Sequence, residues 1–183
     1  YIFLAQGEKL LFEKDFDIQV KNYVLTKNGC DVKDKVFIGN LHKDIDIIIS
    51  GRIEPRKNSI NLLRVLGGAD YKVKFVGSLN KNNKSYTDEF LSLVKGYDNI
   101  DYLGSVTHDD MQSLFKRSKI HISASWFEVS SLVDLEAYFL GCHVISSING
   151  NTNEFIKKNI DFINPEDLSG LNDLLKDILI NYT

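Results

Sequence analysis

Short apolar runs rich in β-branched residues alternate along the chain with longer stretches in which apolar residues recur every three or four positions. The short runs predict strands, and the longer stretches predict amphipathic helices. Strands are expected at residues 46–50, 73–76, 100–103, 120–123, 144–146 and 161–163. Helices are expected near residues 60–66, 86–94, 109–116 and 132–140, with a last helix over residues 166–182.

Some of the predicted strands, such as residues 46–50 and 144–146, contain continuous apolar runs instead of a strict alternation of apolar and polar residues. This pattern is typical of a parallel sheet that helices cover on both faces. The sequence therefore predicts an α/β fold, a Rossmann-like doubly wound parallel sheet with helices on both faces. Ligands of such sheets bind beyond the carboxyl ends of the strands, so the segments that follow each strand are the places to look for function.

The first forty residues fit this alternation less well. Residues 1–27 predict a strand, a helix and a strand, and Asn28-Gly29 is a turn signal. We interpret residues 1–40 as a connecting segment that leads into a domain formed by residues 41–183. The sequence opens at Tyr1 inside an apolar run, so we expect a piece of a longer protein whose missing part supports residues 1–27.

The composition is that of a soluble globular protein: of 183 residues, 43% are hydrophobic and 26% are charged, and the net charge is -3. This charge balance argues against the broad basic surface of a nucleic-acid-binding protein. Cys30 and Cys142 are too few for a disulfide framework, and they lack the spacing of zinc ligands. The two cysteines are therefore expected to be free thiols in a reducing, cytoplasmic compartment. The apolar runs are far shorter than a membrane span.

Three segments that follow predicted strands carry candidate chemistry, and the first begins at Gly51. Arg52 comes next, and Lys57 lies five residues later, just before a helix that begins near Ser59. Free N–H groups at a helix start, together with two cations, form a phosphate-binding site. The alternative is a solvated basic loop in which Ser59 caps the helix. The sequence has neither the glycine fingerprint of a dinucleotide site nor a Walker A loop.

The second segment holds two glutamates, Glu128 and Glu136, eight residues apart. If the helix begins near Ser130, Glu128 lies in the loop before it and Glu136 lies in its second turn. A diphosphate would then fit over the helix N-terminus, with one carboxylate near each end of an extended ligand. The alternative is an acidic residue that favours a helix start and a solvated glutamate farther along the helix.

The third segment runs from Gly141, which is expected to end a helix, through a buried strand to a loop rich in Ser, Asn and Gly that leads to Glu154. Such a loop either offers backbone amides to a ligand or is simply a turn. The four histidines have no metal-ligand spacing, and His121, on a core strand, is expected to be structural. Cys142 is expected to pack as a small hydrophobic residue.

Together, these ordered motifs resemble the C-terminal, nucleotide-sugar-binding half of a GT-B glycosyltransferase of the large retaining family 4 type. That family has Gly-Arg with Lys five residues later, Glu-x7-Glu followed by Ala, Gly-x-x-Val, and a glycine-containing loop that ends in Glu. The matching residues here are Gly51-Arg52, Lys57, Glu128, Glu136-Ala137, Gly141 to Val144, and Gly150 to Glu154. Asn28-Gly29-Cys30-Asp31 and Gly104-Ser105-Val106 match as well, and the resemblance covers residues 24–164.

The resemblance implies a role for each matching residue. Arg52 and Lys57 would hold the donor diphosphate and stabilise the leaving nucleotide. Glu128 would bond sugar hydroxyls, and Glu136 would bond the ribose hydroxyls. The other implied donor contacts are Gly51, Gly77, Ser78, Val106, Ser130, Ser131 and Leu132. Two cations and a helix dipole can take the charge that develops on the diphosphate, so no metal ion and no cofactor are expected.

The resemblance also implies transfer of a hexose, with retention, from a UDP- or GDP-linked sugar to a saccharide or lipid-linked acceptor. The acceptor would bind a missing N-terminal domain, which would also make any peripheral contact with the inner face of the membrane. This chain alone is then expected to be inactive. Where the family has Pro-Phe-Gly after the first glutamate, Val129-Ser130-Ser131 stand here. The alternatives are a sugar-nucleotide epimerase of GT-B architecture and a degenerate, non-catalytic GT-B-like binding module.

Overall fold

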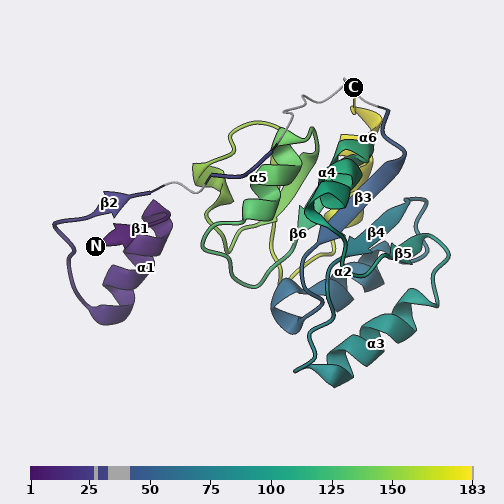
Figure 1. Ribbon diagram of the computed structural model, residues 1–183, viewed down its shortest axis with the longest axis horizontal. Coiled ribbons are helices and arrows are strands. Elements are labelled where there is room, and N and C mark those ends of the chain that lie inside the picture. Colours follow the sequence, from purple (N-terminus) through teal and green to yellow (C-terminus); the bar gives the residue numbers. More distant parts are fainter. Residues whose placement is uncertain (27–28, 33–41, 183) are drawn as a thin grey trace.

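A computed structural model describes residues 1–26, 29–32 and 42–182 of the chain (Figure 1). Its main feature is a six-stranded parallel sheet with the strand order β5-β4-β3-β6-β7-β8. The strands are β3 (Ile45–Ser50), β4 (Val73–Val76), β5 (Ile100–Tyr102), β6 (Ser118–Ser123), β7 (His143–Ser147) and β8 (Ile160–Ile163). The helices of this domain are α2 (Ser59–Leu66), α3 (Lys84–Val94), α4 (His108–Arg117), α5 (Leu132–Phe139) and α6 (Leu171–Ile180), with short 3-10 helices η1 (Pro55–Lys57) and η2 (Thr152–Glu154).

The chain builds this sheet outward from its centre. It runs from β3 to β4 and β5 in one direction, and then returns to the other side of β3 to add β6, β7 and β8. In the register, Ile47 of β3 lies opposite Val73 of β4 and Ile120 of β6. The order of the strands therefore reverses between β3 and β6. A doubly wound sheet binds its ligand outside the carboxyl ends of the strands at such a reversal.

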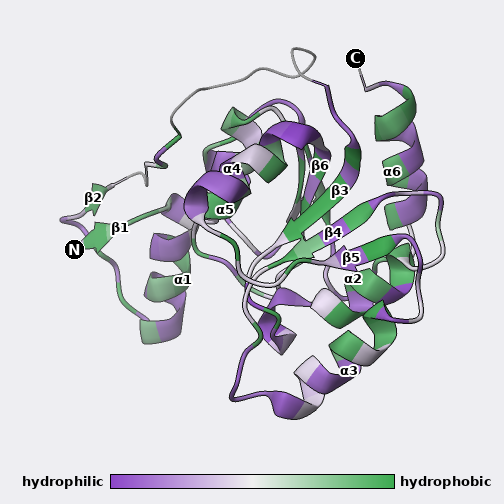
Figure 2. Cartoon of the chain, turned by 45° about the vertical axis from the view of Figure 1, so that its right-hand side comes forward, coloured by the Kyte–Doolittle hydropathy of each residue, from purple (hydrophilic) through white to green (hydrophobic). Residues whose placement is uncertain are grey.

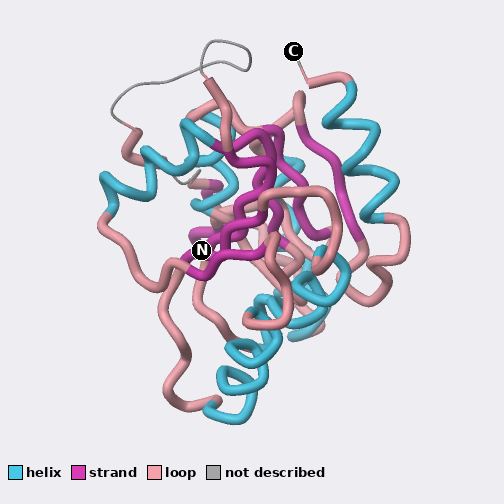
Figure 3. The backbone as a smooth tube through the Cα atoms, turned by 90° about the vertical axis from the view of Figure 1, so that its right-hand side faces the viewer, coloured by secondary structure: helices cyan, strands magenta, loops and turns pink. Residues whose placement is uncertain are grey.

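Helices cover both faces of the sheet, as Figures 2 and 3 show. Successive strand side chains point to opposite faces. Ile47 packs on the face of α2, α3 and α6, in a cluster with Leu63 and Phe90. Ile48 packs on the face of α4 and α5, in a second cluster with Phe115. The predicted α/β fold, a parallel sheet between two helix layers, is confirmed.

The predicted strands and helices of this domain are present, and the largest difference is at the last helix. The sequence predicts a helix from residue 166, whereas α6 begins at Leu171. Asn164 Oδ1 accepts a bond from the Glu166 amide at 3.0 Å, and Asp167 Oδ1 accepts one from the Ser169 amide at 3.0 Å. Such local side-chain bonds compete with helical hydrogen bonds, which explains the later start.

Residues 1–26 form a small unit beside the sheet domain (Figure 1). As the sequence predicts, it consists of β1 (Ile2–Phe3), α1 (Gln6–Phe16) and β2 (Val24–Leu25), and the two strands pair in parallel. Several of its large apolar side chains stay exposed: Tyr1, Ile2, Leu10, Leu11, Phe16, Ile18, Tyr23, Val24 and Leu25. The predicted boundary at residues 40 and 41, and Asn28 of the predicted turn, lie outside the described residues.

The N-terminus of α1 contacts the sheet domain through η2. The amides of Gln6 and Gly7 donate to the two carboxylate oxygens of Glu154, each at 2.8 Å. A Cβ on Gly7 would lie only 1.9 Å from Oδ1 of Asn151, so helix and loop are in close contact. The first amides of a helix have no partner inside the helix, and the helix dipole favours a carboxylate there. Glu154 thus supplies the capping group that α1 lacks in its own sequence.

Candidate functional site

A pocket of about 350 Å³ opens at the carboxyl ends of β3 and β4, beside the reversal of strand order. Its walls come from these strand ends, from the start of α4 and from the first turn of α5. The lining residues are Ser50, Gly51, Val76, Gly77, Ser105, Val106, Thr107, His108, Met111 and Val133. A larger pocket of about 490 Å³ lies at the opposite end of the sheet, between the starts of β7 and β8 and the end of α6. None of the predicted site residues lines that pocket.

Gly51 and Gly77 allow two backbone segments to meet beside this pocket. Each directly follows a strand, and their φ angles are 142° and 145°, which residues with a side chain rarely adopt. A Cβ on Gly77 would lie 1.9 Å from the carbonyl oxygen of Gly51, so a larger residue does not fit. Ser78 lies outside the pocket lining and is exposed. Its carbonyl oxygen accepts a bond from the Ile53 amide at 2.9 Å.

Five charged side chains form what we call the charged cluster: Arg52, Glu54, Arg56, Lys57 and Glu128. The first four belong to the loop after β3 and to η1, and Glu128 belongs to the loop after β6. Lys57 Nζ and Arg56 Nη1 both donate to Oε1 of Glu128, the latter at 2.9 Å. Arg56 Nη2 lies 3.3 Å from Oε1 of Glu54, and Arg52 Nε lies 3.6 Å from Oε2 of Glu54.

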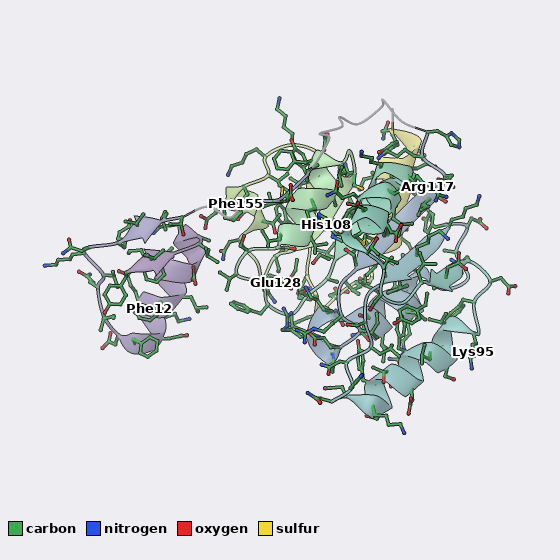
Figure 4. The ribbon with its side chains drawn as sticks, in the orientation of Figure 1. Phe12, Lys95, His108, Arg117, Glu128 and Phe155 are labelled. Carbon is green, nitrogen blue, oxygen red and sulfur yellow. The ribbon has the colours of Figure 1, made fainter. Side chains whose placement is uncertain are left out.

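Burial differs within the charged cluster. The side chains of Glu128 and Lys57 are 16% and 19% exposed, whereas those of Arg56 and Arg52 are 43% and 61% exposed. Burial raises the pKa of Glu128, but the bonds and charges of Lys57 and Arg56 outweigh burial, so this pKa lies below its ordinary value. Glu128 is therefore a carboxylate at neutral pH. Figure 4 shows it on the side of the sheet domain that is turned towards α1.

The N-terminus of α5 forms the other side of the site. Ser131 caps the helix, because its Oγ accepts a bond from the Asp134 amide at 3.3 Å. Glu128 therefore lies in the loop before the helix, and Glu136 lies in the second turn. This is the arrangement in which an anion fits over the helix start between the two glutamates. Leu132, the first helical residue, is exposed.

Three buried serine hydroxyls near the site have no hydrogen-bond partner within the part of the chain that the structure describes. They are Oγ of Ser50, at the end of β3, Oγ of Ser125, just after β6, and Oγ of Ser130, just before α5. A buried hydroxyl without a partner costs free energy, and a ligand that bonds it removes this cost. All three hydroxyls lie at the end of β3 or in the loop after β6.

Glu136 lies close to the start of α4. Partial burial raises its pKa, the nearby His108 and His121 lower it by less, and Asp31 adds to the rise. Asp31 is attached to α4 through its backbone, because Gln112 Nε2 donates to the Asp31 carbonyl at 2.9 Å. Figure 4 labels His108, which stands at the N-terminus of α4 and also lines the pocket.

His121 and Asp134 form a completely buried pair beneath α5. His121 Nε2 lies 3.2 Å from Oδ1 of Asp134, and Nδ1 lies 3.2 Å from the Ile48 carbonyl. Both ring nitrogens therefore lie within hydrogen-bond distance of an oxygen atom. Ser146 and Thr152 donate to the other carboxylate oxygen of Asp134 at 2.7 and 2.9 Å. The expected structural role of His121 is confirmed, and the pair fixes α5 to three strands and η2.

The structure gathers many of the predicted site residues around one end of the sheet. Gly51, Gly77 and Val106 line the pocket, Lys57 contacts Glu128, and residues 130–132 lead into α5. Arg52 and Lys57, which the sequence analysis treats as one phosphate site, bind different carboxylates.

At two positions of this region the structure differs from what the sequence predicts. Arg56 was missed, although it stands beside Lys57, because its partner Glu128 is 72 residues away along the chain. Asn58, with a φ of 58°, occupies the N-cap position of α2, and Ser59 is the first helical residue instead of the cap. The helix thus begins where the sequence predicts, but Ser59 does not cap it.

Three further features bear on the predicted class of protein. Within residues 1–26, 29–32 and 42–182, no group of three or more His, Cys, Asp or Glu side chains is placed to hold a metal ion. None of the helices in these same ranges is long and apolar enough to cross a bilayer. Burial raises the pKa of Cys142 to about 12, so its thiol is unreactive and packs as a hydrophobic group.

Several solved structures are similar to this chain. HepE of Anabaena, solved in complex with UDP, has a TM-score of 0.80 and 18% identity over 98% of this chain and 54% of its own. Sucrose-phosphate synthase of Thermosynechococcus elongatus has a TM-score of 0.77 and 17% identity over 98% of this chain and 49% of its own. A glycosyltransferase of Rickettsia africae has a TM-score of 0.78 and 19% identity over 97% of this chain and 53% of its own.

The chain thus spans about half the length of these solved structures. At such identities the likeness concerns the fold, a Rossmann-like domain of the kind that GT-B glycosyltransferases contain. No curated protein sequence matches the chain significantly. A family match is found over most of the chain, because residues 31–182 fit the family described as Glycosyl transferases group 1. This chain therefore belongs to the group 1 glycosyl transferases.

Proposed function

We propose that this chain is the donor-binding half of a hexosyltransferase that uses a nucleoside-diphosphate sugar, UDP- or GDP-linked, and retains the anomeric configuration. The observation that carries the proposal is the charged cluster, which stands beside a glycine-walled pocket and the N-terminus of α5. A diphosphate needs cations, amide N–H groups and a backbone that it can approach closely. All three lie at the carboxyl ends of β3 and β6, where a doubly wound sheet binds nucleotides.

Each side chain of the site then has a chemical role. Lys57 and Arg52 neutralise the diphosphate, Glu128 accepts bonds from sugar hydroxyls, and Glu136 accepts bonds from the ribose hydroxyls. The remaining donor contacts are the backbone at Gly51, Gly77 and Ser78, the pocket wall at Val106, and the helix start at Ser130, Ser131 and Leu132. The hydroxyl of Ser130 is buried and has no hydrogen-bond partner among the described residues, so a small movement of the loop before α5 would let it bond the donor.

In the transfer step, the bond between the anomeric carbon and the phosphate oxygen breaks, and its electron pair leaves with the nucleoside diphosphate. The acceptor oxygen bonds the same carbon, and its proton passes to the departing phosphate. Cations and helix N–H groups stabilise the charge that develops on the diphosphate. These protein groups take the part that a metal ion plays in other enzymes, so we expect no metal or other cofactor to be required.

The acceptor, a saccharide or lipid-linked sugar, is expected to bind a second, N-terminal domain that this sequence does not contain. The exposed apolar residues of β1, α1 and β2 support this proposal, because a two-stranded sheet with one helix is too small to cover them. We expect the whole protein to act in the cytoplasm, and any peripheral contact with the inner face of the membrane to be made by that second domain.

Calorimetric titration of the Lys57→Ala variant tests the phosphate role. A charge-assisted hydrogen bond is worth about 1.5–3 kcal/mol, so we expect UDP or GDP to bind roughly tenfold more weakly or worse. The corresponding nucleoside, which has no phosphate, should lose little affinity. Lys176→Ala on α6 is the matched control, because that side chain is 63% exposed and far along the chain from the cluster.

Two outcomes would contradict the proposal. The first is an equal loss of affinity for the nucleoside and the nucleoside diphosphate in Lys57→Ala, since the lysine would then not act on phosphate. The second is a wild-type chain that binds none of UDP, GDP, ADP or their sugars in a thermal-shift panel. If the longer protein inverts the sugar of a nucleotide sugar without any acceptor, epimerisation replaces transfer as its activity.

A further inference from the structure

Lys57 is bound to a carboxylate in the very site where the proposed function needs a free cation. Its ammonium donates to Glu128, and its aliphatic chain crosses Gly51, since a Cβ on Gly51 would lie 3.4 Å from Lys57 Cε. Gly51 lines the pocket. The Lys57 side chain therefore lies next to a residue of the pocket while its ammonium is bound to Glu128. A diphosphate that binds Lys57 in this site competes with Glu128 for the same ammonium.

Arg56 makes more contacts than Lys57 with the loop after β6, which carries Glu128. Its Nη1 donates to the Phe127 carbonyl at 3.1 Å and to Glu128 Oε1 at 2.9 Å. Its own carbonyl oxygen accepts a bond from the Trp126 amide at 2.9 Å. On its other side, Nη2 lies 3.3 Å from the buried carboxylate of Glu54. Arg56 thus holds the segment 126–128 by both its backbone and its side chain.

The departure of Lys57 has a consequence for Glu128. The carboxylate would keep one cation instead of two, although its side chain is only 16% exposed. A partly buried carboxylate that loses its charge partners takes up a proton more readily. A protonated Glu128 would accept fewer bonds from sugar hydroxyls and would no longer attract Arg56. Once Lys57 has left, the ionised form of Glu128 therefore depends on Arg56.

We propose that Arg56 is a positioning residue, which holds the Glu128 carboxylate in the donor site while Lys57 moves from that carboxylate to the diphosphate. This inference rests on the proposed function, and it assigns different tasks to two adjacent cations. Lys57 touches the substrate, whereas Arg56 acts through Glu128.

The charged groups that face Glu128 within the described residues are these two cations of η1. On the opposite side, the loop after β7 faces Glu128 with neutral groups: the Glu128 amide donates to the Asn149 carbonyl at 3.2 Å, and Gly150 lies in a parallel bridge with Glu128. Glu54, on the far side of Arg56, balances part of the arginine charge. The cluster as a whole has three cations and two carboxylates, which leaves one positive charge to attract a diphosphate.

The first experiment needs no nucleotide. The side-chain carboxyl carbon of Glu128 is followed by NMR titration in the wild-type chain and in Arg56→Gln. Removing one of two close cations should raise the pKa of Glu128 by about one pH unit. Arg56→Lys, which keeps a charge, should restore most of the wild-type value. Arg64→Gln is the matched control, because Arg64 pairs with Glu89 on the outside of α2 and α3.

The second experiment measures the protons taken up when UDP-glucose or GDP-glucose binds, by calorimetry in buffers of different ionisation enthalpy near pH 5. These donors do not titrate there themselves. We expect Arg56→Gln to take up more protons on binding than the wild type, because its Glu128 is left without a cation when Lys57 turns away. Adding Glu128→Gln to Arg56→Gln should abolish the excess.

An unchanged pKa of Glu128 in unliganded Arg56→Gln would overturn the inference, and so would equal proton uptake by Arg56→Gln and the wild type. A purely structural role of Arg56 would lower affinity without moving either readout. If the wild type binds none of UDP, GDP, ADP or their sugars, the proposed function fails and the task of Arg56 during binding falls with it. The titration of unliganded Glu128 distinguishes this failure from a failure of the contact itself.

Discussion

At the scale of single residues, Asp134 is the carboxylate on which the packing of α5 depends. It is completely buried, and it accepts bonds from His121, Ser146 and Thr152. Replacing it by alanine leaves the buried polar groups of His121, Ser146 and Thr152 without their shared carboxylate partner. Breaking a buried pair in this way typically costs about 3–5 kcal/mol. We expect a loss of this size in the free energy of unfolding of Asp134→Ala, measured by urea denaturation at pH 6.

The pH dependence of this effect has a definite sign. Burial raises the pKa of Asp134, but the bonds from His121, Ser146 and Thr152 lower this pKa by a larger amount. The folded-state pKa of Asp134 is therefore below its ordinary value. Its stabilisation is thus fully present above the unfolded-state pKa of about 3.9, and it is lost as the pH falls through the folded-state pKa. The gap between wild type and Asp134→Ala should shrink below about pH 4. Asp88→Asn, an exposed site on α3, should show no such gap. A gap under 1 kcal/mol at pH 6, roughly the net value of one ordinary hydrogen bond, would contradict this account.

Glu136 shows the opposite sign. Partial burial raises its pKa, so keeping it ionised at neutral pH lowers the stability of the folded chain, and this cost disappears as the pH falls. Glu136→Gln removes the charge. We expect its Tm to rise by up to about 2–4 °C, the change that about 1 kcal/mol produces in a chain of this size. The same variant should lose the preference for UDP over 2′-deoxy-UDP.

Calorimetric scanning and paired titrations measure the two effects of Glu136→Gln separately. A stabilised variant that still prefers the ribonucleotide would show that another group contacts the ribose hydroxyls. If the wild type already binds ribo and deoxy forms alike, the ribose role of Glu136 is wrong. A carboxylate that is unfavourable in the empty site and useful in the filled one is the usual exchange of stability for function.

Much of the candidate site is predictable because parallel strands place their carboxyl ends at one edge of a sheet. The types of Lys57, Glu128 and Glu136, and their positions after strands, therefore indicate a shared site. Which cation binds which carboxylate depends on side-chain geometry that no spacing rule contains. This is why Arg52 was paired with Lys57, and why Arg56 was overlooked.

At the scale of elements, the order and type of the strands and helices follow from hydrophobic periodicity, since each buried strand and each amphipathic helix has its own pattern. The start of α6 does not follow from periodicity, because local bonds of Asn164 and Asp167 replace the first turn that the sequence predicts. The contact between α1 and Glu154 does not follow from periodicity either, because its partners are 147 and 148 residues apart. Long-range contacts of polar groups leave no periodic signal in a single sequence.

The contact between α1 and η2 can be tested through Glu154→Ala. Two amides of the helix start, those of Gln6 and Gly7, then lose a charged acceptor. Bonds to charged groups are worth about 1.5–3 kcal/mol, so amide hydrogen exchange at Gln6 and Gly7 should accelerate by roughly tenfold or more. Exchange is followed by NMR at constant pH.

Glu166→Ala is the control for this measurement, because Glu166 is exposed and lies before α6. It should leave exchange at Gln6 and Gly7 unchanged. If Glu154→Ala also leaves them unchanged, the first turn of α1 is protected by something other than this carboxylate. If exchange accelerates across the whole chain, the substitution has destabilised the sheet domain and not just the docking of residues 1–26.

At the scale of the whole molecule, two exposed surfaces both support the proposal of a further domain. The β1–α1–β2 unit exposes large apolar side chains, and the charged cluster with its pocket stands on a domain edge open to solvent. The unit contacts the loop that leads to Glu154, and Asn151 of that loop donates to the Val129 carbonyl, next to Glu128, at 2.9 Å. A domain that covered the apolar unit would therefore lie close to Glu128 of the charged cluster.

We accordingly expect the chain of residues 1–183 to bind a sugar nucleotide at micromolar affinity or weaker and to transfer no sugar. A single domain leaves the donor in contact with water and does not orient the acceptor. The positioning that supplies several kcal/mol of catalysis is then lost. Incubation with radiolabelled donor and a panel of saccharide and lipid-linked acceptors checks this, with a longer protein that includes the proposed N-terminal domain as the comparison. That longer protein should recover transfer, and its Lys57→Ala variant should not. Multiple-turnover transfer by residues 1–183 alone would contradict this expectation. One domain would then be enough for catalysis, and the acceptor would have to bind the same domain edge as the donor.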